Sequence, residues 1–524
     1  MGGDENPRFL ARPPSGWRRP PERDAPRILV WAGRRSLIVV RAVLNGDDWP
    51  APLLPLQAAF LRRRRHDRVP MAPGMLWARF EHPLLPGRRI VRPVLDVGEA
   101  GLCLEGDVRT DALPPGLALS DLRIVLPDGA EVSLDGTVRA VRTGRGGGAD
   151  RFGIELRPQR RQEAWDRFVL RQLLPDADLL RPDEVEQIWD LFDRTGYLRE
   201  KDPAQLARCR EPFQRTWRTL AHAPGLGAGV VVRDRSVLRG AMFYTRAWPG
   251  TYLLHHLALD LHATAGALTA PQVAGEVYRY LYHACRRMPD LRHAVGLFNA
   301  RSRWWNHLFD DFHALGPPAE WYAVDRLRLV EAPVSDAAGA AAGGSISVGR
   351  LEDHERPAVE QAVRRVVPPL AAAALALDPL DPVLADLQRD FAEVGLLRRR
   401  EVWVARREER ILGAAIADTA SPGTNLFGLL DAVQLLPAED AALEPHWAGA
   451  VLAAVAGRRA ADGAETLTVL CPADVPDVSL PPAFVELATL RRWTAARELL
   501  PLYLTYLDEH FDARRALDGE EPLP

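Results

Sequence analysis

A run of arginines and a short acidic turn are the residues in this sequence whose types and spacing most clearly suggest chemistry. The run spans 62–68 and includes Arg64 and Arg68, and the later turn Asp-Val-Gly-Glu-Ala-Gly begins at Asp96 and ends at Gly101. Arginine forks bind phosphate oxygens and can also bond O6 and N7 of a guanine. An acidic side chain can accept a guanine N–H, and a glycine permits close backbone approach. The pattern therefore predicts a site for an anionic ligand that carries purine bases.

Short strands separated by Gly, Pro and Asp turns must position these residues. Six strand-like segments lie between 62 and 174, and the turns at 127–129 and 144–150 are typical of hairpins. This spacing predicts a small closed barrel or sandwich, followed by a helical pattern at 160–174. An arginine run alone is more often a solvated face or a linker. Its place directly ahead of such a barrel favours a binding site.

The two motifs together resemble the PilZ family, whose signature is RxxxR before a β-barrel and a D/N-x-S-x-x-G turn inside it. Arg64 and Arg68 match the first motif, Asp96 and Gly101 match the ends of the second, and the segments 136–139 and 153–156 fit the rest. The resemblance implies a domain at 61–177 that binds cyclic-di-GMP. It also implies the ligand-binding residues, which are Arg63, Arg64, Arg65, Arg68, Asp96, Gly98 and Gly101.

One position departs from the family pattern. The serine of the turn is Gly98 here, so a side-chain hydroxyl is missing from the expected pocket. One neutral hydrogen bond contributes about 1 kcal/mol, or roughly five- to tenfold in affinity. Two arginines, or more with Arg63 and Arg65, could outweigh this loss.

A second set of candidate residues lies farther along the chain. In the strand expected at 251–261, His256, Asp260 and His262 share one face by the two-residue period, and His255 faces the other side. His256 or Asp260 could act as a general base. A metal site is an alternative, and polar residues on the wet side of a strand are the commoner interpretation.

The order of elements over 178–331 resembles that of GNAT-type acyltransferases. The resemblance implies acyl-CoA as a cofactor and makes His256, Asp260 and Asn299 the catalytic candidates, with Asn299 just past the strand expected at 293–298. The sequence departs from the family at 262–269. A single glycine, with no Arg or Gln, stands there in place of the family's pyrophosphate-binding loop.

A run of small residues at 332–344 predicts a linker, and the same order of elements returns after it. We expect a strand at 345–350, a hairpin at 401–419 and a last strand near 499–507. No glycine loop follows the strand expected at 427–436, so this half is interpreted as degenerate. The predicted fold class is multidomain, a small all-β PilZ barrel followed by two α+β, GNAT-like domains. Its parts are a disordered N-terminus at 1–26, a β-hairpin and connector at 27–60, the PilZ domain at 61–177, an α+β domain at 178–331, the linker at 332–344, a second α+β domain at 345–512 and a tail at 513–524.

The composition is that of an ordinary globular protein. The chain has 524 residues, 47% hydrophobic and 26% charged, and a net charge of −3 gives no preference for DNA, RNA or an anionic membrane. No apolar run reaches the length of a membrane span, and four dispersed cysteines suit a reducing compartment. We therefore expect a cytoplasmic, bacterial signalling protein. It is either an effector with a cyclic-di-GMP-gated acyltransferase or a non-enzymatic adaptor whose C-terminal domains bind a protein partner.

Overall fold

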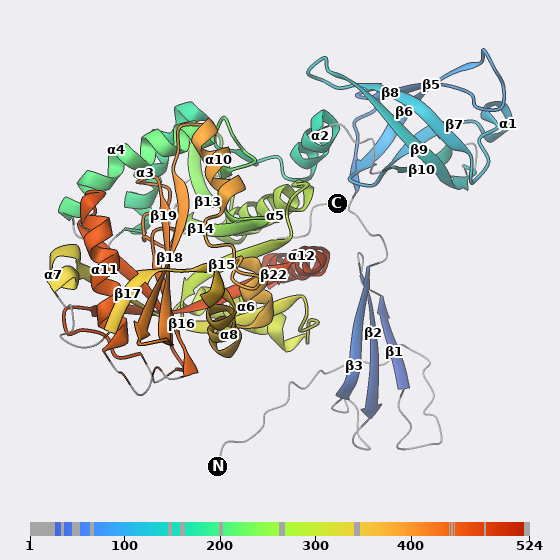
Figure 1. Ribbon diagram of the computed structural model, residues 1–524. Coiled ribbons are helices and arrows are strands. Elements are labelled where there is room, and N and C mark those ends of the chain that lie inside the picture. The colour runs from blue at the N-terminus through green and yellow to red at the C-terminus, as the bar shows by residue number, and fades with distance from the viewer. Residues whose placement is uncertain are drawn as a thin grey trace. The chain divides into compact units, whose positions relative to one another are not determined.

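The chain forms two compact units, Met1–Leu173 (unit 1) and Leu174–Pro524 (unit 2) (Figure 1). The computed structural model describes residues 27–32, 36–44, 53–62 and 68–517, with gaps at 145–148, 158–162, 199–202, 261–267, 340–345, 440, 442–443, 445 and 476–477. None of its helices, within these described residues, is both long and apolar enough to cross a membrane.

Unit 1 begins with a three-stranded antiparallel sheet. Its strands are β1 (Arg27–Ala32), β2 (Ser36–Leu44) and β3 (Leu53–Arg62), paired in the order β1-β2-β3. The predicted hairpin corresponds to β1 and β2. The predicted connector at 45–60 is partly wrong, because 53–62 forms the third strand.

A closed six-stranded barrel follows, as the turn pattern predicts. Its strands pair in the closed order β6-β5-β8-β9-β10-β7-β6, and β4 (Arg68–Pro70) adds to the edge of β6. The barrel strands are β5 (Trp77–Glu81), β6 (Arg89–Gly98), β7 (Gly101–Gly106), β8 (Ala118–Val125), β9 (Glu131–Arg142) and β10 (Asp150–Leu156). A short helix, α1 (Val108–Asp111), follows β7.

Alternate residues of each barrel strand point inward, which is why short alternating strands form this fold. Leu102 and Leu104 on β7 and Phe152 and Ile154 on β10 are fully buried in the barrel core. The helix α2 (Glu163–Leu173) adds the indole of Trp165 to the same core. The residues between these positions are left on the outer face of the barrel.

Unit 2 is built on one twelve-stranded sheet rather than on two separate sheets. The strand order is β11-β12-β13-β14-β15-β22-β16-β21-β20-β19-β18-β17. The strands are β11 (Ala177–Leu179), β12 (Gly227–Asp234), β13 (Val237–Trp248), β14 (Thr251–Leu259), β15 (His293–Asn299), β16 (Tyr322–Pro333), β17 (Ile346–Arg350), β18 (Arg398–Arg407), β19 (Arg410–Ala420), β20 (Val433–Pro437), β21 (Thr466–Pro472) and β22 (Val485–Ala496).

Helices cover both faces of this sheet. They are α3 (Val185–Thr195), α4 (Pro203–Leu220), α5 (Ala270–Arg287), α6 (Arg303–Ala314), α7 (Val334–Gly339), α8 (Arg356–Val366), α9 (Pro369–Ala374), α10 (Ala385–Glu393), α11 (Trp447–Ala461) and α12 (Leu500–Leu517). Most of these elements lie where the apolar periodicity places them.

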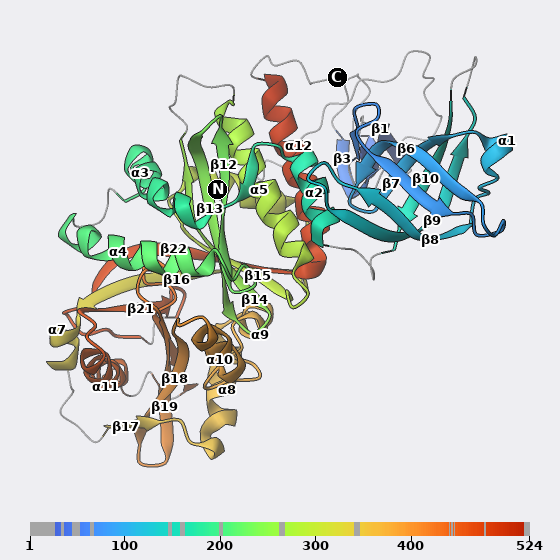
Figure 2. The same ribbon diagram turned by 90° about the horizontal axis from the view of Figure 1, so that it is seen from above.

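Two strands are exchanged between the halves at the centre of the sheet. β22 comes from the second half but pairs with β15 and β16 of the first, and β16 in turn pairs with β21 of the second (Figure 2). Each half therefore depends on a strand that the other half supplies. The order of elements suggested two independent α+β domains, each with a sheet of its own. The structure instead has one sheet to which both halves contribute.

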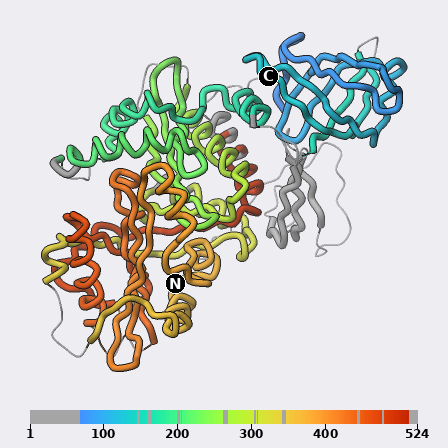
Figure 3. Tube along the Cα trace, turned by 45° about the horizontal axis from the view of Figure 1, so that its top comes forward, coloured from blue at the N-terminus to red at the C-terminus, as the bar shows by residue number. Residues whose placement is uncertain are grey.

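The packing also joins the halves. One core cluster contains Phe192 and Trp217 from α3 and α4 together with Val363 from α8 and Phe391 from α10. In Figure 3 the green first half and the orange second half lie against each other. The two halves therefore share one hydrophobic core.

Two local predictions in unit 2 are wrong. The expected linker is largely ordered, because 332–333 end β16 and 334–339 form α7, whose Val334 and Ala337 pack in a core with α11. The strand expected near 499–507 is part of helix α12, and the last strand is β22. The sequence Leu-Tyr-Leu-Thr-Tyr-Leu at 502–507 has the alternation typical of a strand, although it is helical. The sequence of β22 contains several polar residues and lacks that alternation, so it was not predicted as a strand.

A buried ionic network lies at the seam between the halves. The Asp418 carboxylate accepts Arg400 Nε at 2.7 Å, Arg398 Nη2 at 3.0 Å and Trp248 Nε1 at 2.9 Å. The two arginines hold the pKa of this carboxyl well below its usual range despite its burial. Arg398 also donates to the carbonyl of Ala247, so the network ties β13 of the first half to β18 and β19 of the second.

We predict that Asp418→Asn lowers the free energy of unfolding by about 3–5 kcal/mol, because two buried guanidinium groups lose their counter-charge. Urea unfolding of the full-length protein, followed by tryptophan fluorescence, measures this change. The matched control is Asp462→Asn, which removes an exposed carboxylate that pairs with Arg399 and Arg458 and should cost less than about 1 kcal/mol. Equal effects of the two substitutions would show that the buried network does not hold the seam.

Candidate functional site

The barrel brings four of the predicted ligand-binding residues together at one edge. β4 runs antiparallel to β6, which places Arg68 opposite Gly98. The Arg68 Nη1 lies 2.8 Å from Asp96 Oδ1, and the two side chains are 26% and 27% exposed. The pair therefore holds a guanidinium in place while leaving both groups within reach of a ligand.

Gly101 follows at the start of β7 and faces the same edge. A Cβ at this position would lie 2.4 Å from the carbonyl oxygen of Ile154 and 3.2 Å from Arg68 Nη2. Only glycine allows β7 and β10 to approach this closely beside the arginine. The other predicted contacts, Arg63, Arg64 and Arg65, lie outside the described residues.

The outer face next to this edge is made of small side chains. Cys103, Gly153 and Ala140 stand opposite one another on β7, β10 and β9. Their strand neighbours Leu102 and Phe152 point into the core, so these three lie on the other side of the strands, where Ala140 is exposed, Gly153 is half-buried and Cys103 is 8% exposed. The result is a shallow floor against which a planar base could lie.

Two further arginines border the floor and were not predicted from the sequence. Arg142 and Arg151 stand opposite each other on β9 and β10, in phase with Ala140 and Gly153. Burial and Asp96 raise the pKa of the Cys103 thiol, and Arg68, Arg151 and Arg142 oppose that rise, so three cations act on the floor. The alternation of Arg151 and Gly153 with buried Phe152 and Ile154 is the sequence signal that could have revealed this face.

The strand β14 carries the first two catalytic candidates, and its geometry differs from the expected alternation. His256 has a φ of 53°, and the pairing of β13 with β14 shifts register beside it. As a result His255 and His256 lie on the same side, with ring centroids 4.4 Å apart and both rings beside Phe243. The two-residue period of a regular strand would place His255 and His256 on opposite faces. The bulge interrupts that period, so the prediction does not hold here.

Both ring nitrogens of His256 are engaged inside the protein. Nε2 accepts the backbone N–H of Leu426 at 3.2 Å, so the ring proton sits on Nδ1, which faces the hydroxyl of Tyr197 at 3.1 Å. The side chain is 2% exposed. It is surrounded by the aromatic rings of Phe192, Phe213, Phe243 and Phe427. This geometry favours a structural role, because neither nitrogen has a lone pair directed at a substrate.

The remaining candidates also have partners within the fold. Asp260 lies 3.7 Å from Arg194 Nε and 3.8 Å from Arg239 Nε. Asn299 Oδ1 accepts the N–H of Arg301 at the turn that leads into α6. His256, Asp260 and Asn299 therefore each serve a different local contact, and no interaction links them. His262 lies outside the described residues, within which no cluster of three potential metal ligands occurs.

We predict that His256→Leu lowers the free energy of unfolding by about 2–4 kcal/mol, because the N–H of Leu426 and the hydroxyl of Tyr197 both lose a buried partner. Chemical denaturation of the full-length protein gives the value, and His354→Leu, at an exposed histidine, is the control. A stability equal to that of the control variant would contradict the structural role.

The sequence matches no family model and no curated protein. Similar solved structures include a PilZ domain with c-di-GMP of YcgR from Escherichia coli, at 12% identity and a TM-score of 0.16 over 18% of this chain and 82% of that one. A tandem GNAT protein from the clavulanic acid biosynthesis pathway is 13% identical, with a TM-score of 0.33 over 61% of this chain and 98% of that one. A GCN5-related N-acetyltransferase from Sphaerobacter thermophilus is 11% identical, with a TM-score of 0.37 over 61% and 95%. These values are too low to carry an argument about ligand or activity.

Proposed function

We propose that this chain is a cyclic-di-GMP receptor whose barrel face binds the nucleotide. The observation that carries the proposal is the Arg68–Asp96 pair beside Gly101, at the edge of a floor of small residues. The arginines would hold the phosphates, Asp96 would accept a guanine N–H, and a base would lie against Cys103 and Gly153. This arrangement corresponds to the contacts that the PilZ resemblance implies.

We further propose that unit 2 is a GNAT-like module that acts mainly as a binding partner. The support comes from its candidate catalytic groups. His256 has both nitrogens engaged, and Asp260 lies between two arginines. The engagement of these two candidate bases fits an adaptor that transmits nucleotide binding to a protein partner. A coupling of about 1–3 kcal/mol would give 5- to 150-fold control.

Acyl-CoA-dependent acyl transfer is the second candidate, and one observation favours it. The parallel pairing of β14 with β15 covers only Thr251–Leu254, although β14 continues to Leu259 and β15 to Asn299. The two strands therefore separate in the part of the sheet where a GNAT-type enzyme holds its acyl-CoA.

Isothermal titration of the full-length protein with cyclic-di-GMP tests the receptor function. We expect a Kd in the micromolar range or below and a loss of about 100-fold or more in Arg64→Ala/Arg68→Ala, since each charge-assisted bond contributes roughly 1.5–3 kcal/mol. Arg123→Ala removes an exposed barrel arginine that pairs with Asp121 and should bind normally. An absence of binding at about 100 µM would refute the receptor assignment.

The same titration can measure what the missing hydroxyl costs. Gly98→Ser restores the family's side chain and should tighten binding roughly five- to tenfold. Arg151→Ala should weaken it, because that guanidinium borders the floor. If Gly98→Ser and Arg151→Ala both leave the affinity unchanged, the ligand does not occupy this face.

A thermal-shift screen with acetyl-CoA and longer acyl-CoAs separates the two roles of unit 2. The adaptor role predicts no change in Tm at any chain length. A rise of a few degrees with one acyl-CoA, followed by acyl transfer to an amine, would establish the enzyme instead.

A further inference from the structure

Exposed apolar side chains gather on one hairpin of the barrel, formed by β5, the loop 82–88 and β6. Five of the twelve large hydrophobic side chains that are exposed in the described part of the chain belong to it, at 40–62% exposure. They are Met75, Trp77, Leu84, Leu85 and Val91. The outward-facing residues of 75–93 are called the hairpin face below. Apolar side chains gathered at one place on the surface of a domain mark a contact site.

The pairing of β5 with β6 sets apolar and basic side chains next to each other on the hairpin face. Trp77 stands opposite Pro93 and Arg79 opposite Val91, and the residues between them are buried or half-buried. In the closed ring of strands, β5 and β6 lie across from β9 and β10, which carry the small-residue floor (Figure 1). A partner on the hairpin face would therefore leave the floor open to a nucleotide.

The loop of the hairpin is held in place with its two leucines in solvent. The buried His82 accepts the N–H of Leu84 through Nδ1 at 3.1 Å, and its Nε2 donates to the carbonyl of Ala112 at 3.2 Å. Oε1 of Glu81 accepts the N–H of Gly87 at 2.6 Å, and a proline stands on each side of the leucine pair. A loop fixed in advance loses little freedom on binding, so it suits recognition.

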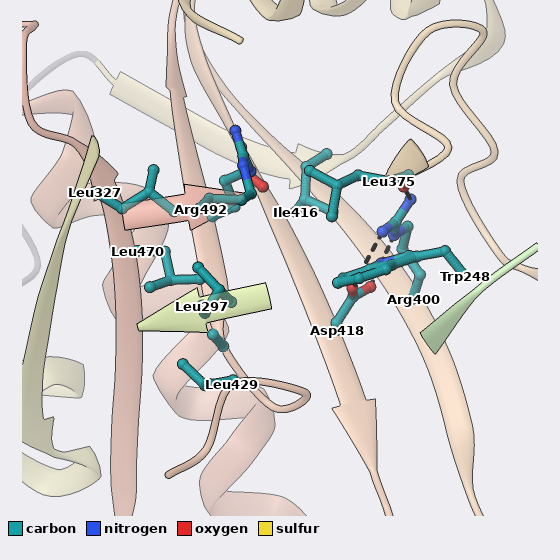
Figure 4. A pocket seen from close by; sticks show the side chains of 12 residues that line it. Trp248, Leu297, Leu327, Leu375, Arg400, Ile416, Asp418, Leu429, Leu470 and Arg492 are labelled. Atoms are coloured by element: carbon teal, nitrogen blue, oxygen red, sulfur yellow. Dashed lines mark hydrogen bonds and ion pairs between the residues drawn. The ribbon is translucent and has the colours of Figure 1, made fainter. Parts of the chain in front are cut away.

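Two arginines of the hairpin face have no partner in the described part of the chain. Arg79 and Arg89 are exposed, and neither side chain makes a hydrogen bond or an ion pair with a described residue. Arg88, in the loop, donates to a carbonyl of α1. At the seam of unit 2 the arginines are paired, as Figure 4 shows for Arg400 and Asp418. Arg79 and Arg89 thus remain available to carboxylates from outside.

The carboxylates nearest to these two arginines are already engaged. Glu81, opposite Arg89 on the hairpin, accepts a backbone N–H of its own loop. Asp121 and Glu131, on the next two strands of the barrel, both pair with Arg123. The hairpin face therefore combines an apolar surface with two positive charges that the barrel itself does not neutralise.

We propose that the hairpin face binds a segment of a partner protein in which apolar side chains stand beside carboxylates. Trp77 is the central contact, because tryptophan, methionine and arginine are the residues that protein interfaces favour. The carboxylates of the segment pair with Arg79 and Arg89. This surface goes beyond the receptor and adaptor roles and stands whether or not the barrel binds cyclic-di-GMP.

Two other occupants suit the hairpin face less well. An anionic membrane would meet the carboxylate of Glu81 within the face and those of Asp121 and Glu131 beside it. A second copy of the chain, docked symmetrically, would bring four unpaired arginines together with only two copies of Glu81 to oppose them. A separate protein with carboxylates of its own has neither disadvantage.

Selection of random peptides displayed on phage, carried out on the full-length protein, tests the proposal. Peptides of about 16 residues can run the length of the hairpin as a helix or a strand. We expect the enriched peptides to combine Trp, Phe or Leu with Asp or Glu, and synthetic copies to bind with a Kd of roughly 1–100 µM by fluorescence anisotropy. A selection that enriches no peptide, or only peptides rich in Lys and Arg, would overturn the proposal.

Trp77→Ala and Arg79→Glu are the decisive variants. Each should weaken peptide binding about tenfold or more. Both should keep the native Tm and the native response to cyclic-di-GMP, because the two side chains are exposed and lie across the barrel from the floor. Leu487→Ala and Arg410→Glu, at exposed positions of unit 2, are the matched controls and should bind the peptides normally. Peptides that bind all four variants equally would place their site elsewhere and reject the hairpin face.

Two measurements on the same variants distinguish the other occupants. Co-sedimentation with vesicles of phosphatidylserine and phosphatidylcholine reports lipid binding, and sedimentation velocity reports self-association. We expect the native protein and Trp77→Ala to behave alike in both. Vesicle binding or a dimer that the native protein shows and Trp77→Ala loses would assign the face to lipid or to a second copy and contradict the proposal.

Discussion

The carboxylate of Asp418, buried between Arg398 and Arg400, is the interaction on which unit 2 depends. Removing a charge from water is costly, and this one is tolerated because each of its oxygens accepts hydrogen bonds from groups fixed by the fold. Those groups come from both halves, so the network forms only when the halves are in register. Loss of this carboxylate would therefore weaken the contact between β13 of the first half and β18 and β19 of the second.

Buried polar groups in this module fall into two kinds. His256 and Asp418 have their hydrogen-bonding capacity used by the protein and so contribute rigidity. Gln434 has a buried carboxamide Nε2 that donates to no group among the residues that the structure describes. On the barrel, Arg68 and Asp96 are paired with each other yet remain partly exposed. Residue type alone does not distinguish a structural polar group from a binding one. The distinction depends on whether its hydrogen-bonding atoms are already paired within the protein and on whether solvent reaches them.

Local patterns in the sequence predicted most of the elements and part of the barrel site. Apolar runs separated by turn residues placed β12 to β16 and α5 within a few residues, and β12, β13 and β14 give such runs because nearly all of their residues are buried. The spacing of Arg68, Asp96 and Gly101 predicted their meeting, since hairpins bring such positions together. Strand exchange could not be predicted, because β22 pairs with strands more than 150 residues away and its own sequence lacks an apolar alternation. The bulge at His256 likewise depends on contacts with Tyr197 and Leu426 that no local pattern encodes.

The exchange of β16 and β22 has a consequence for how the protein is made. A ribosome adds about 5–20 residues per second, and domains usually fold as they emerge. Here the first half emerges with the place between β15 and β16 empty, and it stays so until Val485–Ala496 has been synthesised. Unpaired strand edges invite association with other chains. The nascent first half therefore leaves the facing edges of β15 and β16 unpaired until β22 has been made.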